Sequence, residues 1–361
     1  MVILSSNETA AHCFKNKHAA LDGDAGGVIM REAFGVKNRT HIPKIIESVL
    51  MPTATLSLLP NSLTSTSVLY NQSLFTHLNK LSSSSPDVVV TLSTLSSASV
   101  YIATSLSVLG PLFPVDSYDD FVTLDAGLPY LMANIPFLGS KAKAARGRLL
   151  SHINVYINDG WRNDGDGYIE GASEFISGAV RVFKQASLSE SDSAGLLLGL
   201  LVGIHANVIR MVFWLVAYLL NDQDAFSRVQ EEVRTTVAAQ FSDITSLLAS
   251  DLIELNQTNF PLVDSAIKET LRLTALPSSL REAKFDTQIV GENGRVYHIE
   301  KGDRVLVDSR GVHLDESVYP DPETFKIDRF VSSADSTSRP RNVLTFGGGA
   351  HIVRIFFFNP P

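Results

Sequence analysis

A long, almost uninterrupted apolar segment, Gly195–Leu220, constrains the fold of this chain more than any other feature. By length alone, a helix over this segment could cross a membrane. However, His205, Asn207 and Arg210 lie near its middle, and a central arginine costs about 2.5–3.5 kcal/mol on insertion scales. The segment is therefore predicted to be a long helix in a protein core, and a single membrane span is the weaker alternative.

The patterns on either side of this segment predict a mainly helical chain with a small β region. Apolar residues recur at helical spacing both before and after it. Between Leu280 and Asp308 the apolar period changes to two, which predicts strands joined by glycine-containing turns. The predicted helices cover 70–81, 88–110, 119–131, 140–159, 224–240 and 262–273, and the predicted strands cover 295–299 and 303–307. This order is typical of an α+β fold with helix in excess.

Composition narrows the possible partners. The chain has 361 residues, of which 45% are hydrophobic, and a net charge of −8 from 30 basic and 38 acidic residues. No basic run is interleaved with aromatic residues, so nucleic acid is not an expected partner. Cys13 is the only cysteine and lies in a polar stretch, so we expect neither an internal disulfide nor a ligand role for it. Residues 1–24 show no basic-then-apolar signal pattern, so we expect neither a membrane anchor nor a first β-region there.

A pair of opposite charges lies in the predicted helix over 262–273. Glu269 and Arg272 are three residues apart, so they share a helix face. Alone, such a pair on an exposed helix contributes little to stability. Arg329, in a later Pro- and Asp-rich segment, offers a second guanidinium for the same carboxylate. One carboxylate between two guanidiniums can hold a helix and a distant loop in a fixed relation through bidentate hydrogen bonds.

Near the end of the chain, Gly347, Gly348 and Gly349 follow one another. Glycines allow a backbone to approach a ligand closely or to adopt positive φ. A phosphate-binding loop would continue with Lys and then Ser or Thr, whereas Ala350 and His351 follow here. The run therefore favours close approach to a ligand of another kind.

Three motifs, in this order and spacing, resemble the C-terminal half of a cytochrome P-450, a haem-thiolate monooxygenase. They are the Glu-x-x-Arg pair at 269–272, the Pro-Asp-Pro segment at 319–330 and the glycine-rich loop at 346–351. The resemblance covers roughly residues 113–352. It implies one incomplete P-450 domain over 1–361, shortened at both ends, with a weakly matched helical part (1–190), a core from the long helix to the haem loop (191–352) and an aberrant C-terminus (353–361).

The resemblance also implies roles for single residues. Glu269, Arg272 and Arg329 would form a buried structural triad that braces the haem-binding loop. In that loop Phe346, Gly347, Gly349 and His351 would lie against the haem, with the imidazole of His351 directed to a propionate. Arg281 is the second candidate propionate partner. Haem is accordingly the expected cofactor.

Val353 departs from the family pattern at its defining position. The loop of the family leads into a cysteine that binds the iron, and here valine, which offers no lone pair, occupies that position. We therefore expect no metal ligand in this loop and no thiolate catalysis by the chain as written. A retained intron, a frameshift and a decayed gene are the three origins considered for the departure.

The long helix resembles the family's central helix on the oxygen-binding side of the haem. Ala206 and Asn207 stand where the family usually has an acid and a threonine. Together with Phe213 and Trp214, this variant resembles the branch that contains sterol 7α-hydroxylases and prostacyclin synthase. An asparagine can hydrogen-bond an oxygen ligand but cannot relay a proton as a hydroxyl does, so hydroxylation and rearrangement of an oxygenated lipid both stay open. The alternative role of Asn207 is a hydrogen bond to a neighbouring helix.

Taken together, these residues predict an oxidoreductase of the monooxygenase class that acts on a sterol or another apolar lipid. As a monooxygenase it would need NADPH–cytochrome P-450 reductase, whereas an isomerase would need no reductase. The location expected from full-length relatives is the endoplasmic reticulum membrane. The alternatives are a non-enzymatic fragment, a pseudoenzyme and a lipid isomerase lineage.

Overall fold

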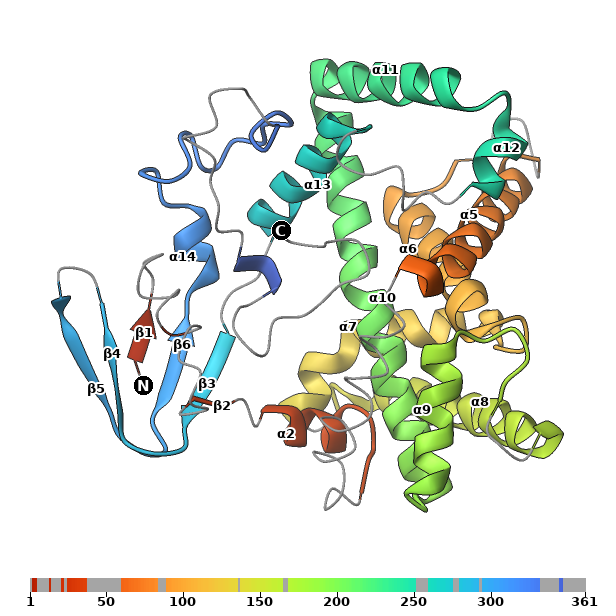
Figure 1. The fold of residues 1–361 in the computed structure, drawn as a ribbon. Coiled ribbons are helices and arrows are strands. Elements are labelled where there is room, and N and C mark those ends of the chain that lie inside the picture. Colours follow the sequence, from red (N-terminus) through yellow and green to blue (C-terminus); the bar gives the residue numbers. More distant parts are fainter. Residues whose placement is uncertain are drawn as a thin grey trace. The chain divides into compact units, whose positions relative to one another are not determined.

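The computed structural model describes residues 2–4, 13, 21–22, 25–37, 60–83, 89–135, 137–164, 168–250, 259–274, 279–291, 294–331 and 344–346. The chain divides into two compact units. We call the first the helical unit, formed by Gly26–Phe213 and Phe241–Leu255, and the second the mixed unit, formed by Met1–Ala25, Trp214–Gln240 and Asn256–Pro361. The helix α10 contributes residues to each (Figure 1).

The helical unit consists of helices packed around an apolar core. Its α-helices are α2 (Ala25–Glu32), α5 (Pro60–Ser83), α6 (Leu92–Thr104), α7 (Tyr118–Met132), α8 (Ser140–Asp164), α9 (Glu174–Gln185), the first part of α10 (Glu190–Asn221) and α12 (Ile244–Ala249). The short 3₁₀ helix η3 (Val115–Ser117) precedes α7. The predicted helices over 70–81, 88–110, 119–131 and 140–159 are confirmed as α5, α6, α7 and α8, whereas α9 and α12 were not predicted.

The apolar segment from which the prediction started is helical. It forms most of α10, and Leu197, Leu198 and Leu201 of this helix have no exposed surface. Arg210, in the middle of this segment, forms an ion pair with α7: its Nη2 donates to Asp125 Oδ2 at 2.7 Å. Two helical stretches, Leu92–Leu109 and Glu190–Asn221, are apolar and long enough to cross a membrane by these two criteria alone.

Glycines permit two close approaches in the helical unit. α6 continues directly into the π-helix η2 (Ser105–Leu109), which ends at Gly110 with φ of +84°. A Cβ on Gly110 would lie 2.7 Å from the backbone of Gly171 and Ala172. Between α7 and α8, a Cβ on Gly127 would collide with the Cβ of Ala142. A side chain at either glycine would therefore force the neighbouring backbone apart.

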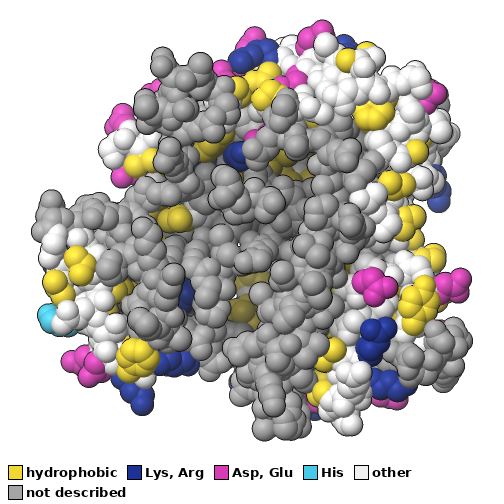
Figure 2. All heavy atoms as spheres, in the orientation of Figure 1, with side chains coloured by type: hydrophobic (Ala, Val, Ile, Leu, Met, Phe, Trp, Pro, Cys, Tyr) yellow, Lys and Arg dark blue, Asp and Glu magenta, His cyan; other side chains and the backbone are white. Residues whose placement is uncertain are grey.

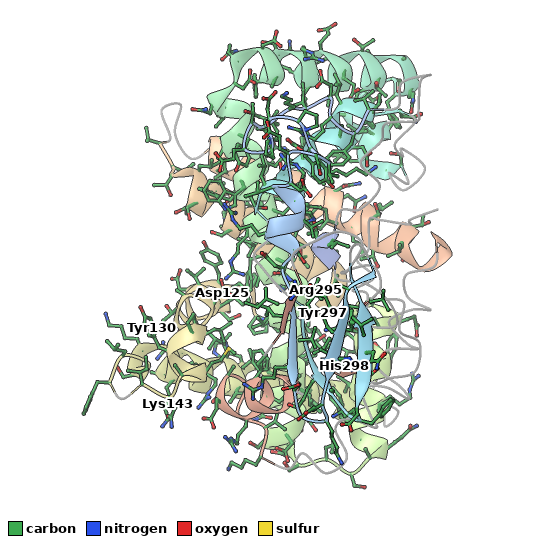
Figure 3. All side chains as sticks on the ribbon, turned by 90° about the vertical axis from the view of Figure 1, so that its left-hand side faces the viewer. Asp125, Tyr130, Lys143, Arg295, Tyr297 and His298 are labelled. Atoms are coloured by element: carbon green, nitrogen blue, oxygen red, sulfur yellow. The ribbon has the colours of Figure 1, made fainter. Side chains whose placement is uncertain are left out.

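The mixed unit contains both sheets. The larger sheet has the order β1-β6-β3-β2, with β1 (Val2–Leu4) parallel to β6 (Arg304–Val307), and β3 (Ser279–Ala283) antiparallel to both β6 and β2 (Leu21–Asp22). The strands β4 (Thr287–Val290) and β5 (Val296–Ile299) form an antiparallel hairpin. In Figure 3, Arg295 and its neighbours Tyr297 and His298 mark β5, and the Arg295 guanidinium lies 5.1 Å from the Tyr297 ring centre.

The mixed unit also contains helices. They are the last turns of α10, α11 (Gln223–Gln240), α13 (Pro261–Thr274), α14 (Ser309–His313) and the 3₁₀ turn η6 (Leu344–Phe346). The predicted helices over 224–240 and 262–273 and both predicted strands are confirmed, and the α+β class with helix in excess is confirmed with them.

The absence of a first β-region in residues 1–24 was a wrong prediction, because β1 and β2 pair with β6 and β3. Both strands are too short to show a periodic pattern in the sequence.

Charge is mixed on the described surface. On the face drawn in Figure 2, Lys and Arg side chains are interspersed with Asp and Glu. Cys13 lies in a small apolar cluster with Ile289, Ile299 and Val305, and its side chain is almost fully buried. The burial of this thiol, which the sequence did not predict, raises its pKa to about 11.

Candidate functional site

The candidate site is a buried network around Glu269 in the mixed unit. Glu269 and Arg272 lie on α13, and both side chains have no exposed surface. Arg272 donates from Nε to Glu269 Oε2 and from Nη2 to Oε1, each at 2.8 Å. This is the planar, bidentate geometry that a guanidinium makes with a carboxylate. The pairing predicted from the spacing of these two residues is therefore present in the structure.

Arg329 completes the network from the Pro-Asp-Pro segment. Its Nε donates to Glu269 Oε1 at 2.9 Å, and 6% of its side chain is exposed. Its two terminal nitrogens donate to three backbone carbonyls, those of Pro320, Asp321 and Thr324. One arginine thus fixes the course of a loop and attaches that loop to α13.

His313 extends the network in a direction that the sequence did not reveal. Arg272 Nη1 donates to the backbone carbonyl of His313 at 2.6 Å, and the Leu344 N–H donates to His313 Nε2 at 2.8 Å. Leu344 begins η6, directly before the glycine run. The imidazole accepts from Leu344 in its neutral form, which burial and the charge of Arg272 favour by lowering its pKa to about 4. The only sequence signal was a histidine closely following the strands.

Tyr319 covers the flat side of the network. The guanidinium carbon of Arg272 lies 5.0 Å from the centre of the Tyr319 ring, which is a cation–π distance. Burial raises the pKa of Tyr319 to about 12. Beside it, Tyr218 from α10 stacks on Phe325 with ring centres 4.8 Å apart. The Pro-Asp-Pro segment is therefore held by aromatic packing as well as by hydrogen bonds.

The helix that carries Glu269 is itself held at its first turn. The side chain of Glu232, on α11, accepts the backbone N–H groups of Leu262 and Val263 at 2.8 and 3.0 Å. These N–H groups have no partner within the helix, and a carboxylate at this end also interacts favourably with the positive end of the helix dipole. Pro261 opens α13, the position at which a missing N–H is tolerated. α13 is therefore oriented by a side chain from another helix, which the sequence did not predict.

The other predicted site residues lie elsewhere or outside the description. Ala206 is buried on α10, whereas Asn207 is exposed. The Asn207 side chain forms no hydrogen bond with any other residue that the structure describes. Arg281 lies on β3, opposite Val305. The backbone of Phe346 belongs to η6, and Gly347, Gly349, His351 and Val353 lie outside the described residues.

Among the residues that the structure describes, Cys13 is the single thiol, and its surroundings do not suit a thiolate ligand of haem. Cys13, the only cysteine of the sequence, sits in an apolar cluster where its raised pKa keeps the thiol protonated at neutral pH. Val353 has no lone pair to offer. Within the described residues, no cluster of three His, Cys, Asp or Glu side chains could hold a metal ion. The described part of the site is the network around Glu269, which reaches Leu344 through His313.

Comparisons with known proteins agree with this geometry. The family model described as Cytochrome P-450 matches residues 170–352, which include the whole network. The chain is 32% identical over 235 residues to cytochrome P-450 7A1 of Oryctolagus cuniculus, a match that covers 62% of this chain and 44% of the relative. It is 28% identical over 168 residues to prostacyclin synthase of Bos taurus, covering 46% of this chain and 33% of the relative. The match thus spans less than half of either relative.

The fold has a counterpart among solved structures. A retinoic-acid-bound cyanobacterial P-450 superimposes with a TM-score of 0.68 at 19% identity, covering 96% of this chain and 76% of that chain. At this identity the likeness concerns the fold alone. It agrees with the mainly helical architecture and small β region described above.

Proposed function

The chain belongs to the cytochrome P-450 family, and from that premise we propose that it comes from a lineage of haem-binding monooxygenases that act on a sterol or another lipid. Haem is the cofactor of this family. The observation that carries the proposal is the buried Glu269 carboxylate shared by Arg272 and Arg329, within the matched residues. The sterol or lipid substrate is supported by the relatives, among them a cholesterol 7-alpha-monooxygenase of Cricetulus griseus that is 32% identical.

We propose further that the chain as written lacks thiolate catalysis, because Val353 stands at the position of the iron-binding cysteine. Substitution Val353→Cys supplies the missing sulfur, and Val353→Ser is the matched control that adds a polar group without a thiolate. The full chain and both variants are purified with haem added, reduced, and treated with carbon monoxide. We expect a thiolate-type absorption band in the cysteine variant alone.

Two results would contradict this proposal. A thiolate-type band in the unsubstituted chain would show that a group other than residue 353 binds the haem iron. A cysteine variant that unfolds cooperatively but binds no haem would refute the haem-binding lineage and favour a non-enzymatic protein. Sequencing the native transcript across the codons for His351 and Ile352 tests the intron hypothesis separately, which fails if no transcript continues into a cysteine.

A second candidate function is isomerisation of an oxygenated lipid. Ala206 and Asn207 on α10 favour it, since neither can relay a proton to bound oxygen in the way that an acid and a threonine do. The likeness to prostacyclin synthase supports the same alternative. The two are separated in the cysteine variant: hydroxylation of a sterol requires added NADPH–cytochrome P-450 reductase, whereas rearrangement of a lipid peroxide proceeds without it.

The two compact units are proposed to be parts of one P-450 domain. The sequence contains two tryptophans, Trp161 in the helical unit and Trp214 in the mixed unit. Single-tryptophan variants, each with the other replaced by Phe, therefore report on one unit at a time. Coincident urea transitions are expected for one domain, and separate transitions would contradict it.

A further inference from the structure

The contact between α7 and α10 ends in an ion pair that is open to solvent. In the core of the helical unit, the ring centres of Phe121 and His205 lie 5.4 Å apart. About one turn further along both helices, Arg210 Nη2 donates to Asp125 Oδ2 at 2.7 Å, and 52% of the Arg210 side chain is exposed. Figure 3 labels Asp125 on α7. The edge of this helix contact therefore carries a guanidinium that a ligand can reach.

Arg210 has hydrogen-bonding capacity to spare. Its guanidinium carries more N–H donors than its bonds to Asp125 and, at 3.3 Å, to the Ala206 carbonyl use. Asn207, three residues earlier on the same face of α10, is exposed, and its side chain forms no hydrogen bond within the described part of the chain. A Cβ on Gly203, one turn before it, would meet no described atom within 4 Å. α10 thus presents polar groups beside an open stretch of its surface.

α7 places apolar side chains on either side of the ion pair. Val122 is 40% exposed and lies about one turn before Asp125. Ala126 and Pro129, which follow Asp125, are exposed as well. Residues three and four apart share a helix face, so the carboxylate is flanked by apolar surface along α7. Where the two helices meet, the surface is apolar on α7 and rich in hydrogen-bond donors on α10.

The charge of this surface is already balanced. Asp125 pairs with Arg210, and the second carboxylate oxygen, Oδ1, is buried without a hydrogen-bond partner among the described residues. A ligand anion at Arg210 would lie close to this carboxylate and be repelled by it. A neutral oxygen, such as that of a hydroxyl or a ketone, accepts from Arg210 and Asn207 without that repulsion. The geometry therefore favours a neutral ligand over an acid.

We propose that Arg210 and Asn207 bind the neutral oxygen of an apolar lipid, whose body lies along Val122, Ala126 and Pro129. In such sites apolar contact supplies most of the affinity, and a few polar groups fix the orientation and the specificity. The inference rests on the proposed function for the lipid class and adds the residues that select within that class. Alcohols and ketones should bind, whereas acids and plain hydrocarbons should bind weakly.

The test is binding of dehydroergosterol, a fluorescent sterol with one hydroxyl, to the full chain without haem, followed by energy transfer from tryptophan. Competition by cholesterol, by cholestane, which lacks the hydroxyl, and by the anion cholesteryl sulfate gives a dissociation constant for each. In wild type, cholesterol should bind about tenfold or more tightly than cholestane, because a hydrogen bond to a charged group contributes at least that factor. The sulfate should bind no better than cholestane.

Two substitutions should reduce this preference for the hydroxyl. Arg210→Lys keeps a positive charge for Asp125 but removes the planar fork of donors, and Asn207→Leu removes the amide. Each should lower the ratio of the cholestane and cholesterol dissociation constants severalfold while cholestane binding changes little. Arg148→Lys is the matched control, because Arg148 is similarly exposed and pairs with Asp120, also on α7. This control should keep the wild-type ratio.

The outcomes separate this inference from the proposed function. If wild type binds dehydroergosterol but both substitutions keep its preference, Arg210 and Asn207 do not select the ligand, and the proposed lipid function stands. Tighter binding of the sulfate than of cholesterol would overturn the neutral oxygen. A wild-type chain that binds none of these sterols would refute the inference together with the sterol assignment, while the haem test on Val353→Cys still decides the haem-binding lineage. Circular dichroism should show that every variant retains its helix content.

Discussion

Each of the two units buries a cluster of polar side chains. The cluster in the mixed unit is made of charged groups, whereas the cluster in the helical unit is made of neutral ones. In the mixed unit, the Glu269 carboxylate lies between the guanidiniums of Arg272 and Arg329, so charge pairing offsets the cost of burial. In the helical unit, His205 of α10 has no exposed surface and lies beside Ser105 of η2 at 3.1 Å and the carbonyl of Leu201 at 2.8 Å. Burial lowers the pKa of His205 to about 4, so this cluster is neutral at physiological pH.

The difference determines how each cluster responds to the loss of one member. A buried charge left without its partner retains its full desolvation penalty, whereas a neutral group loses only a hydrogen bond and some packing. It also determines what can be predicted. A carboxylate and two guanidiniums form a motif in the sequence, while a histidine that contacts carbonyl oxygens has no motif at all.

The largest effect is expected for Glu269→Gln. Two guanidiniums would face a neutral amide in a site with no exposed surface, and breaking such a pair costs roughly 3–5 kcal/mol. Urea unfolding followed through Trp214 measures this loss in the mixed unit. Glu323→Gln, an exposed glutamate in the same unit, is the matched control and should change stability by less than about 0.5 kcal/mol. A similar change for both variants would mean that the network is not a charged one.

The pH dependence should be the next largest effect. The pKa values of His205 and His313 are lowered from 6.5 to about 4 in the folded protein. Between these two values the unfolded chain binds more protons than the folded one, so stability is lost as the pH falls from 6.5 towards 4. A shift of this size corresponds to about 3 kcal/mol for each histidine.

Single-tryptophan probes assign this pH effect to each unit. His205→Gln should flatten the pH dependence reported by Trp161, and His313→Gln should flatten that reported by Trp214. If both variants keep the slope of wild type between pH 4 and 6.5, carboxylates outside these clusters dominate, and the comparison between the units fails on this point.

A smaller loss is expected for Arg272→Lys. Lysine keeps the charge but cannot make the two parallel bonds to Glu269 while also donating to the His313 carbonyl. Losing charge-assisted bonds of this kind costs about 1.5–3 kcal/mol. Lys268→Arg, on the same helix but with 23% of its side chain exposed and a carboxylate partner in Asp264, is the control for arginine–lysine exchange. A free energy of unfolding equal to that of wild type would show that charge alone, and not geometry, holds the network.

The smallest effect is expected in the neutral cluster. Ser105→Ala removes one hydrogen bond to His205 and should cost about 1 kcal/mol. A double-mutant cycle of Ser105→Ala with His205→Gln isolates their coupling, which should be of the same order. A coupling as large as that between Glu269 and Arg329 would erase the distinction between the two clusters.

The parts of the fold that the sequence predicted are those with a long, repeated pattern. α10, α8 and α13 follow from apolar spacing, and the Glu269 network follows from charge spacing combined with a family motif. β1 and β2 could not be predicted, because strands of two or three residues have no period and exist through pairing with β6 and β3. His313 and Glu232 were missed since each acts on the backbone of a segment far away in the sequence, which no local pattern encodes.

The contact of Glu232 with the first turn of α13 has a consequence for modularity. Because the carboxylate that caps α13 belongs to α11, the segment that carries Glu269 is not a self-contained part that could be exchanged between relatives. A chimaera that takes α13 and the Pro-Asp-Pro segment from one protein and α11 from another would join two halves of one cap. Recombination in this lineage is therefore expected to tolerate crossovers before α11 or after Phe330, and to reject those between them.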